Sequence, residues 1–220
     1  MTRRRGFTIW ELLIVLGVVF ILSAIMFPTC VTPFWSPPRQ NARRASCQSN
    51  LKQVGLGILQ YSQDFDEKFP LINVNDAAIS ESNPLGWADA LQPYVKSNQI
   101  FWCPSQEASG QRSSSTTRPS DRDYTDYFLN QRLAGIDTEK NVLSTYTIML
   151  GEGNDGTDAA NARYSLSTLP AAWIANKESP LYRHLEGANY LFADGHVKYY
   201  KPATITNKKP DEGIPTFAIK

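Results

Sequence analysis

The start of the chain constrains its fold and location more than any other stretch. Arg3, Arg4 and Arg5 precede Gly6, and the 21 residues 7–27 that follow form an apolar run holding one carboxylate, Glu11. At 1.5 Å of rise per residue, about 20 apolar residues span a bilayer core. A secretory signal peptide has a shorter apolar region, about 7–15 residues, followed by a small-residue cleavage site. Here the small residue comes first, which predicts a transmembrane helix or an uncleaved signal anchor.

The order of basic residues, Gly6, Phe7-Thr8, Glu11 and a long apolar helix resembles a type IV prepilin leader. The resemblance implies that a dedicated peptidase cuts between Gly6 and Phe7 on the cytoplasmic side and methylates the new N-terminal Phe7. Residues 1–6 are then a leader peptide, residues 7–27 a transmembrane and filament-core helix, and the rest of the chain extracytoplasmic.

Glu11 has two interpretations. A carboxylate in a membrane helix costs about 2.5–3.5 kcal/mol at the centre and less near an end, so Glu11 can lie at the head-group level beside the arginines. The resemblance implies instead that Glu11 pairs with the freed amine of Phe7 on a neighbouring subunit during filament assembly. A charge away from water needs a partner of opposite sign, and cleavage creates one. We favour the second interpretation.

Charge and cysteine content narrow the function classes. The formal net charge is +1, and loss of residues 1–6 leaves 19 Lys and Arg against 21 Asp and Glu. This near balance is no electrostatic signature of specific nucleic-acid binding. The three cysteines are an odd number, so one disulfide and one free thiol are expected in an oxidising compartment. Because Cys30 lies at the membrane edge, Cys47 and Cys103 are the expected pair.

The remaining pattern predicts an α+β fold. Residues 28–38 carry four prolines, which predict a break in the helix. Residues 39–220 should form a pilin-like soluble domain, in which an amphipathic helix over about 37–64 packs on a later antiparallel sheet. Helical spacing gives this helix one buried stripe: Cys47, Leu51, Val54, Ile58, Tyr61 and Phe65.

Strands are expected at 124–129 and 146–150, and a hairpin at 188–201. The hairpin is the clearest of these, because Asp194-Gly195 separates two β-rich runs and suits a type I′ turn. A short helix is expected near 87–95, an exposed polar loop at 106–123 and a loosely ordered tail from 202.

A second resemblance covers nearly the whole chain. His184, nine residues and Asp194-Gly195 match the motif that names a prepilin-like family, the His-x9-Asp-Gly family. Further segments resemble the same family: 42–53, Tyr61, Phe69-Pro70, Phe101-Trp102-Cys103-Pro104-Ser105 and Gly151-Glu152-Gly153.

Enzymatic chemistry is not expected. His184, Asp194 and Glu152 are acid–base candidates, but Asp194 is explained by the turn, and no Ser or Cys nucleophile stands out beside His184 in the sequence. Two histidines without a Cys-x2-Cys pair give zinc no better support. We therefore expect no catalytic residue and no cofactor.

Calcium is the more plausible metal, because residues 151–158 place carboxylates among glycines. Its candidate ligands are Glu152, Asp155 and Asp158. The segment lacks EF-hand spacing, so an ordinary polar loop is favoured over a calcium site.

These features predict a structural subunit of a type IV pilus-like or type II secretion pseudopilus-like filament. The expected partners are further pilin-like subunits, the prepilin peptidase, an assembly platform with its ATPase, and inner-membrane lipid before assembly. The filament would lie at the cell surface or in the periplasm. The alternative is an uncleaved single-pass protein that carries an extracytoplasmic binding module.

Overall fold

The computed structural model describes residues 8–31, 36–73, 84–107, 118–138, 145–154, 156, 159–209 and 213–219. The chain forms two compact units, residues 1–39 and 40–220, and each is described by itself. The leader and the cleavage junction expected between Gly6 and Phe7 fall on residues that lie outside the described ones.

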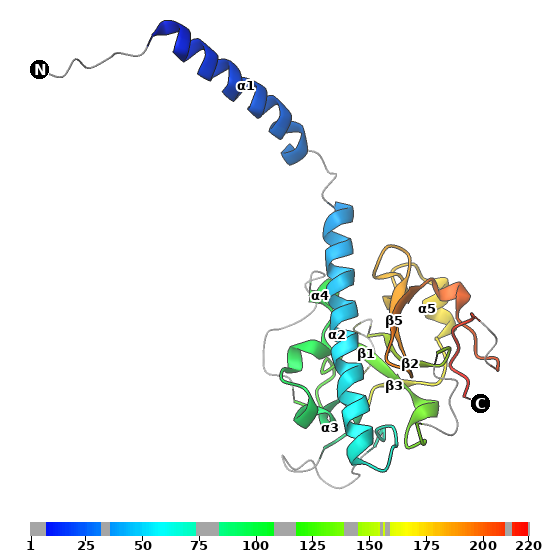
Figure 1. Ribbon diagram of the computed structural model, residues 1–220. Helices are drawn as coiled ribbons and strands as arrows, with labels where there is room; N and C mark the ends of the chain where they lie inside the picture. The colour runs from blue at the N-terminus through cyan, green and yellow to red at the C-terminus, as the bar shows by residue number, and fades with distance from the viewer. Residues whose placement is uncertain are drawn as a thin grey trace, which may run out of the picture. The chain divides into compact units, whose positions relative to one another are not determined.

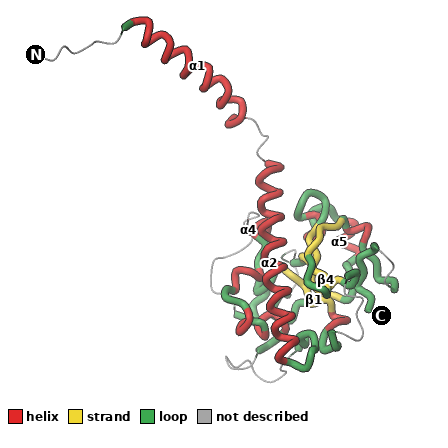
Figure 2. Tube along the Cα trace, viewed as in Figure 1, coloured by secondary structure: helices red, strands yellow, loops and turns green. Residues whose placement is uncertain are grey.

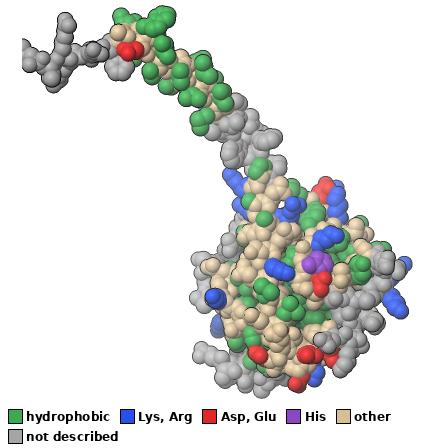
Figure 3. Space-filling model, in the orientation of Figure 1, with side chains coloured by type: hydrophobic (Ala, Val, Ile, Leu, Met, Phe, Trp, Pro, Cys, Tyr) green, Lys and Arg blue, Asp and Glu red, His purple; other side chains and the backbone are tan. Residues whose placement is uncertain are grey.

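The first unit contains one apolar helix, α1 (Ile9–Val31). Its large apolar side chains from Ile9 to Met26 are 50–80% exposed, and apolar side chains dominate its visible surface (Figure 3). Among the described residues it is the one helix long and apolar enough to cross a membrane, with a mean hydropathy of 2.6 over Ile9–Met26. Such a helix fits a single-pass anchor or a signal sequence.

Pro28 does not end α1, which continues to Val31, and α2 begins at Ser36. The break expected over 28–38 is therefore not found at 28–31 or 36–38, where the chain is helical, and residues 32–35 lie outside the described residues. A proline removes only its own N–H and clashes with one carbonyl, so a helix can pass a single proline at a local cost.

In the second unit, α2 (Ser36–Asp64) packs on the sheet as its periodicity predicts (Figure 1). Cys47, Leu51, Val54 and Ile58 are fully buried, and Tyr61 is 8% exposed. Phe65 was expected in the same stripe but is half exposed, because the helix ends at Asp64. Its ring stacks on Tyr61 with centroids 4.2 Å apart.

Gly55 marks how closely α2 approaches the sheet. A Cβ at this position would lie 2.9 Å from both Cδ atoms of Leu191 on strand β4 (Ala188–Phe192). The contact places this face of the helix directly on the sheet.

The sheet has five strands in the order β3-β1-β2-β4-β5. Their bounds are β1 (Tyr127–Asn130), β2 (Ile148–Glu152), β3 (Ser165–Leu166), β4 (Ala188–Phe192) and β5 (Val197–Tyr200). The pairs β1–β2, β2–β4 and β4–β5 are antiparallel, whereas β3 adds to β1 in parallel. The α+β class is confirmed, with a sheet that is mostly rather than wholly antiparallel.

Apolar side chains cover both faces of the sheet. In the backbone trace, the strands lie between α2 and α5 (Figure 2). One cluster joins α2, α3 (Trp87–Ala90), η2 (Gln92–Tyr94) and η3 (Asn98–Phe101) to the sheet. The other includes Trp173 of α5 (Ala171–Ala175) and Leu181 of η5 (Pro180–Tyr182). A short helix, α4 (Pro104–Glu107), follows Cys103, and η6 (Pro202–Thr204) follows the last strand.

The C-terminal segment is better packed than its composition predicts. Phe217 is fully buried and stacks on Phe128 of β1 with centroids 5.8 Å apart. The amide of Ile148 donates to the carbonyl of Thr216 at 2.8 Å. A buried aromatic ring and backbone hydrogen bonds together hold the segment against the second face of the sheet.

Candidate functional site

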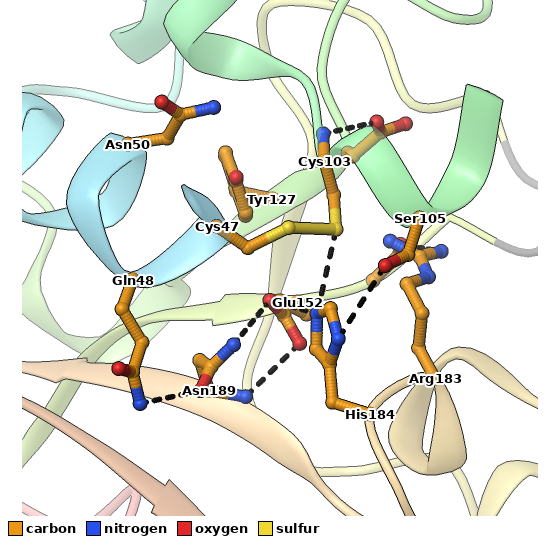
Figure 4. Close-up of polar contacts among 12 residues, drawn as sticks. Cys47, Gln48, Asn50, Cys103, Ser105, Tyr127, Glu152, Arg183, His184 and Asn189 are labelled. Carbon is orange, nitrogen blue, oxygen red and sulfur yellow. Dashed lines mark hydrogen bonds and ion pairs between the residues drawn. A yellow bond between two sulfur atoms is a disulfide. The ribbon is translucent and has the colours of Figure 1, made fainter. Parts of the chain in front are cut away.

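Four of the segments that resemble the His-x9-Asp-Gly family supply one residue each to a buried cluster (Figure 4). Cys47 comes from α2, Cys103 precedes α4, Glu152 ends β2 and His184 follows η5. The first three side chains are fully buried and His184 is 1% exposed.

Cys47 and Cys103 form a disulfide, the pairing expected from the sequence, with Cα atoms 5.2 Å apart. It ties α2 to the segment between η3 and α4. Two hydrogen bonds reinforce this link: the Cys103 amide donates to Asp126 Oδ2 at 2.8 Å, and Asn50 Nδ2 donates to the Trp102 carbonyl at 2.8 Å.

The Glu152 carboxylate is bonded on both oxygens. Oε1 accepts from His184 Nε2 at 2.9 Å and from Asn189 Nδ2 at 2.8 Å, while Oε2 accepts from the Asn189 amide at 3.0 Å. Gln48 Nε2 donates to Asn189 Oδ1 at 3.0 Å and extends the network to α2. A buried carboxylate is tolerated when its oxygens are satisfied in this way.

His184 lies between the carboxylate and the disulfide. Its Nε2 is also 3.4 Å from Cys103 Sγ, and its Nδ1 is 3.5 Å from Ser105 Oγ. A proton on Nε2 is assigned from the bond to Glu152, because a carboxylate can only accept. The Cys and Ser side chains beside His184 were not anticipated, since they lie far from it in the sequence.

A strained turn positions His184. Leu185 and Glu186 have φ of +52° and +70°, and the His184 amide donates to the Gly187 carbonyl at 3.0 Å. Positive φ in non-glycine residues costs on the order of 1–3 kcal/mol and persists where the surroundings impose it. At Gly187, the residue that ends this turn, a Cβ would lie 2.6 Å from the Tyr199 ring and hydroxyl, so a side chain does not fit there without a shift of its neighbours.

Two further residues complete the surroundings of the cluster. Burial, together with the negative charges of Glu152 and Asp126, raises the pKa of Tyr127 well above its usual value, so its hydroxyl stays protonated. Arg183 Nη2 donates to the carbonyls of Gly153 and Asn154 at 3.0 and 2.7 Å. Its buried Nη1 has no hydrogen-bond partner among the described residues.

Asp194 and Gly195, the second part of the His-x9-Asp-Gly pattern, make contacts outside the buried cluster. Asp194 Oδ1 accepts from the amide and Nδ1 of His196, and the Gly195 carbonyl accepts from Lys52 Nζ of α2. The predicted hairpin is present, but its turn is not type I′. Gly195 has φ of +83°, whereas Asp194 has no positive φ. The Phe192 amide donates a hydrogen bond to the His196 carbonyl, which closes a loop of three residues. This is a type I turn followed by a glycine bulge, which needs only one left-handed residue.

Gly195→Ala is expected to lower the free energy of unfolding by about 1–2 kcal/mol, because an L-residue is disfavoured in the left-handed region. The new Cβ would also lie 3.3 Å from Leu59 Cδ1 of α2. Gly213→Ala is the matched control, since Gly213 also has φ of +83° but has nothing within 4 Å of its Cβ position. Urea unfolding followed by tryptophan fluorescence should show the larger loss for Gly195→Ala; an equal or smaller loss would contradict docking of the turn on α2.

Glu152, one of the three candidate calcium ligands, is not available to an ion in the loop that follows β2. Glu152 points into the buried cluster, where three donors occupy its oxygens, and not toward the loop that follows β2. Asp155 and Asp158 lie outside the described residues.

At the start of α1, Thr8 and Glu11 form a capping box. Glu11 Oε2 accepts from the Thr8 amide at 2.9 Å and from its hydroxyl at 2.8 Å, and the Glu11 amide lies 3.4 Å from Thr8 Oγ1. The motif satisfies donors that a helix start leaves unpaired. This local role for Thr8 and Glu11 was not anticipated, although Thr-x-x-Glu is its sequence signal.

Residues 36–146 match a family described as a protein of unknown function, DUF1559. The chain belongs to this family. The match includes α2, both disulfide cysteines and β1, and ends before Glu152 and His184. Together with the apolar N-terminal helix, membership fits a pilin-like or membrane-anchored protein. No curated protein and no solved structure matches the chain.

Proposed function

We propose that this DUF1559 protein is a structural subunit of a type IV pilus-like or pseudopilus-like filament. The observation that carries the proposal is α1, whose large apolar side chains are 50–80% exposed along its length. Water cannot solvate such a helix favourably, so its surroundings must be lipid or other apolar helices. Filament assembly would move α1 from lipid into contact with other apolar helices. Its partners would be copies of this chain or related pilin-like subunits.

The polar start of α1 suits this exchange. The Thr8 amide and hydroxyl both donate hydrogen bonds to Glu11 Oε2. The other carboxylate oxygen, Oε1, receives no hydrogen bond from any residue that the structure describes. In the proposed filament, Oε1 accepts a charged hydrogen bond from the Phe7 amine of a neighbouring subunit. That amine exists only after cleavage between Gly6 and Phe7, so processing by a prepilin peptidase precedes assembly.

Before assembly, α1 would hold the subunit in the inner membrane with the α+β domain outside the cytoplasm. An assembly platform and its ATPase would supply the work of extraction. The visible face of the domain intersperses acidic and basic side chains, as expected for a filament exterior without a specific nucleic-acid ligand (Figure 3).

A second candidate function is a membrane-anchored binding module that keeps residues 1–6. The four prolines of residues 28–38 favour it, because they would interrupt the helical core of a filament. Against this candidate, an uncleaved chain has no Phe7 amine to pair with Glu11.

Gly6→Val is expected to abolish processing completely, because it places a branched side chain at the cleavage junction. Intact-mass and N-terminal analysis of the native membrane and sheared surface fractions measures the effect. The wild-type chain should begin at methylated Phe7 and occur in the sheared fraction, whereas the variant should keep Met1 and stay in the membrane. Thr2→Val, which changes the leader away from the junction, is the control and should mature normally.

Two outcomes would contradict the proposal. A Gly6→Val chain that still matured and assembled would exclude the assigned junction. A wild-type chain that kept residues 1–6 and occurred only in the membrane would favour the anchored binding module.

A further inference from the structure

The buried cluster combines four side chains that ligate metals. One ligand atom from each of Cys47, Cys103, Glu152 and His184 lies within 4.8 Å of the other three. They come from four separate segments of the fold, and all four are at most 1% exposed (Figure 4). Such a convergence exceeds what a disulfide requires, because a disulfide needs neither an imidazole nor a carboxylate.

We infer that this cluster binds one zinc ion when the Cys47–Cys103 disulfide is reduced. The ligands are the two Sγ atoms, His184 Nε2 and one Glu152 oxygen. Zinc takes four ligands from thiolate, imidazole and carboxylate groups in a tetrahedron, and the sulfurs favour it over calcium or magnesium. While the disulfide is intact, the sulfurs are bonded to each other, and the site cannot form.

The spacing of the ligand atoms suits a zinc tetrahedron. Bond lengths of about 2.3 Å to sulfur and about 2.0–2.1 Å to nitrogen or oxygen separate a sulfur from a nitrogen by about 3.6 Å, and a nitrogen from an oxygen by about 3.3 Å. The distance from His184 Nε2 to Cys103 Sγ is 3.4 Å, and that to Glu152 Oε1 is 2.9 Å. The other pairs of ligand atoms lie within 4.8 Å of one another, and the two sulfurs must separate from a covalent bond to about 3.8 Å.

Outer-shell contacts for the ligands are already in place. Asn189 donates to both oxygens of Glu152 and is held in turn by Gln48. When Nε2 binds zinc, the imidazole proton resides on Nδ1, which faces Ser105 Oγ at 3.5 Å. Such partners fix the orientation and tautomer of metal ligands.

The charges of the site also balance. Two thiolates, one carboxylate and Zn²⁺ sum to one negative charge in a buried environment, which needs a nearby cation. Arg183 lies beside the cluster (Figure 4), and its buried Nη1 has no hydrogen-bond partner among the described residues. The guanidinium supplies the compensating charge.

The redox step is a thiol–disulfide exchange. A dithiol reductant transfers two electrons and two protons to the Cys47–Cys103 bond, which breaks to two thiols while the reductant becomes a disulfide. Zinc then displaces the two thiol protons to the solvent, because only thiolates ligate it. Oxidation reverses both steps and releases the metal, so the site is zinc-binding only under reducing conditions.

The test uses the full chain in detergent micelles with Co²⁺ as the spectroscopic probe for zinc. A phosphine reduces the disulfide by giving it two electrons and adds no competing thiol. One water molecule supplies the oxygen of the resulting phosphine oxide and the two protons of the thiols. The reduced chain should then bind one Co²⁺, with the intense visible bands of tetrahedral cobalt and a near-ultraviolet thiolate-to-cobalt band. Zinc should displace the cobalt and remove both signals, and the oxidised chain should give neither.

The chain offers matched control variants for the histidine and cysteine ligands. His184→Ala should weaken metal binding by more than about 100-fold, while Ser105→Ala, which alters an outer-shell contact, should weaken it by about 10–100-fold. His196→Ala removes the other histidine, and Cys30→Ser removes the third thiol; neither should change the spectrum or affinity. Circular dichroism of each reduced chain checks that its fold is retained.

Three results would overturn the inference: a folded reduced chain without a thiolate-to-cobalt band, equal affinity in His184→Ala and wild type, or loss of binding in Cys30→Ser. If reduction unfolds the chain, zinc added together with the phosphine should restore the circular dichroism spectrum, since binding to the folded site then drives folding. Failure of zinc to restore it would equally exclude the site.

Discussion

Glu152→Ala is expected to lower the free energy of unfolding by about 3–5 kcal/mol, because it removes the acceptor shared by three buried hydrogen-bond donors. The carboxylate accepts three hydrogen bonds, from His184 Nε2 and from the amide and Nδ2 of Asn189. Alanine would leave these three buried donors without an acceptor, at about 1–3 kcal/mol for each unsatisfied group before relaxation. Urea unfolding of the full chain in mild detergent, followed by tryptophan fluorescence, measures the change.

Glu152→Gln is the conservative control for this prediction. Glutamine has nearly the same shape and keeps one carbonyl oxygen for Asn189 or His184, but its NH2 group cannot accept. Glu152→Gln should therefore lower the free energy of unfolding less than Glu152→Ala does. If alanine cost less than about 1 kcal/mol, or no more than glutamine, the carboxylate would not be holding the cluster together, and local burial of apolar groups would explain the region.

Local patterns in the sequence predict the parts of the fold that depend on local physics. The stripe from Cys47 to Tyr61 follows helical periodicity, and its members are buried as expected. Asp194-Gly195 predicts the hairpin, although the turn type depends on how many residues the loop contains. Phe65 and Phe217 show the limit: the place where a helix ends and the docking of a tail depend on tertiary contacts.

The cluster itself could not be assembled from spacing. Glu152 and His184 are 32 positions apart, and Cys103 and His184 are 81 apart, so only the folded sheet and α2 bring them together. Metal-site and catalytic patterns read from sequence rely on short spacings, which this site lacks. The sequence held one partial signal: four of the segments that resemble the His-x9-Asp-Gly family contain one member of the cluster each, whereas Tyr61 and Phe69-Pro70 contain none. The resemblance therefore narrows the candidate residues but does not by itself place a residue in the cluster.

Cys47→Ala/Cys103→Ala is expected to lower the free energy of unfolding by about 4 kcal/mol. The disulfide joins residues 56 positions apart, and closing a loop of that length restricts the unfolded chain by about this amount in the loop-entropy description. The loop contains the second half of α2, together with Trp87, Leu91 and Phe101 of the core cluster that covers α2. The same urea titration measures the loss, and Cys30→Ala, which removes a thiol outside the domain, should stay within about 0.5 kcal/mol of wild type.

Comparison with the reduced wild-type chain separates the disulfide from the zinc site. Both the reduced wild type and the double alanine variant lack the covalent link, so without metal both should be destabilised to a similar degree. Zinc that binds only the folded state stabilises it by about 2.7 kcal/mol at a free concentration 100 times its dissociation constant. The reduced wild type should therefore recover most of its loss when zinc is added, whereas the alanine variant, which has no sulfur ligands, should recover none. A double variant as stable as wild type would show that packing of α2 on the sheet alone holds this region, and the disulfide would then have no stabilising role.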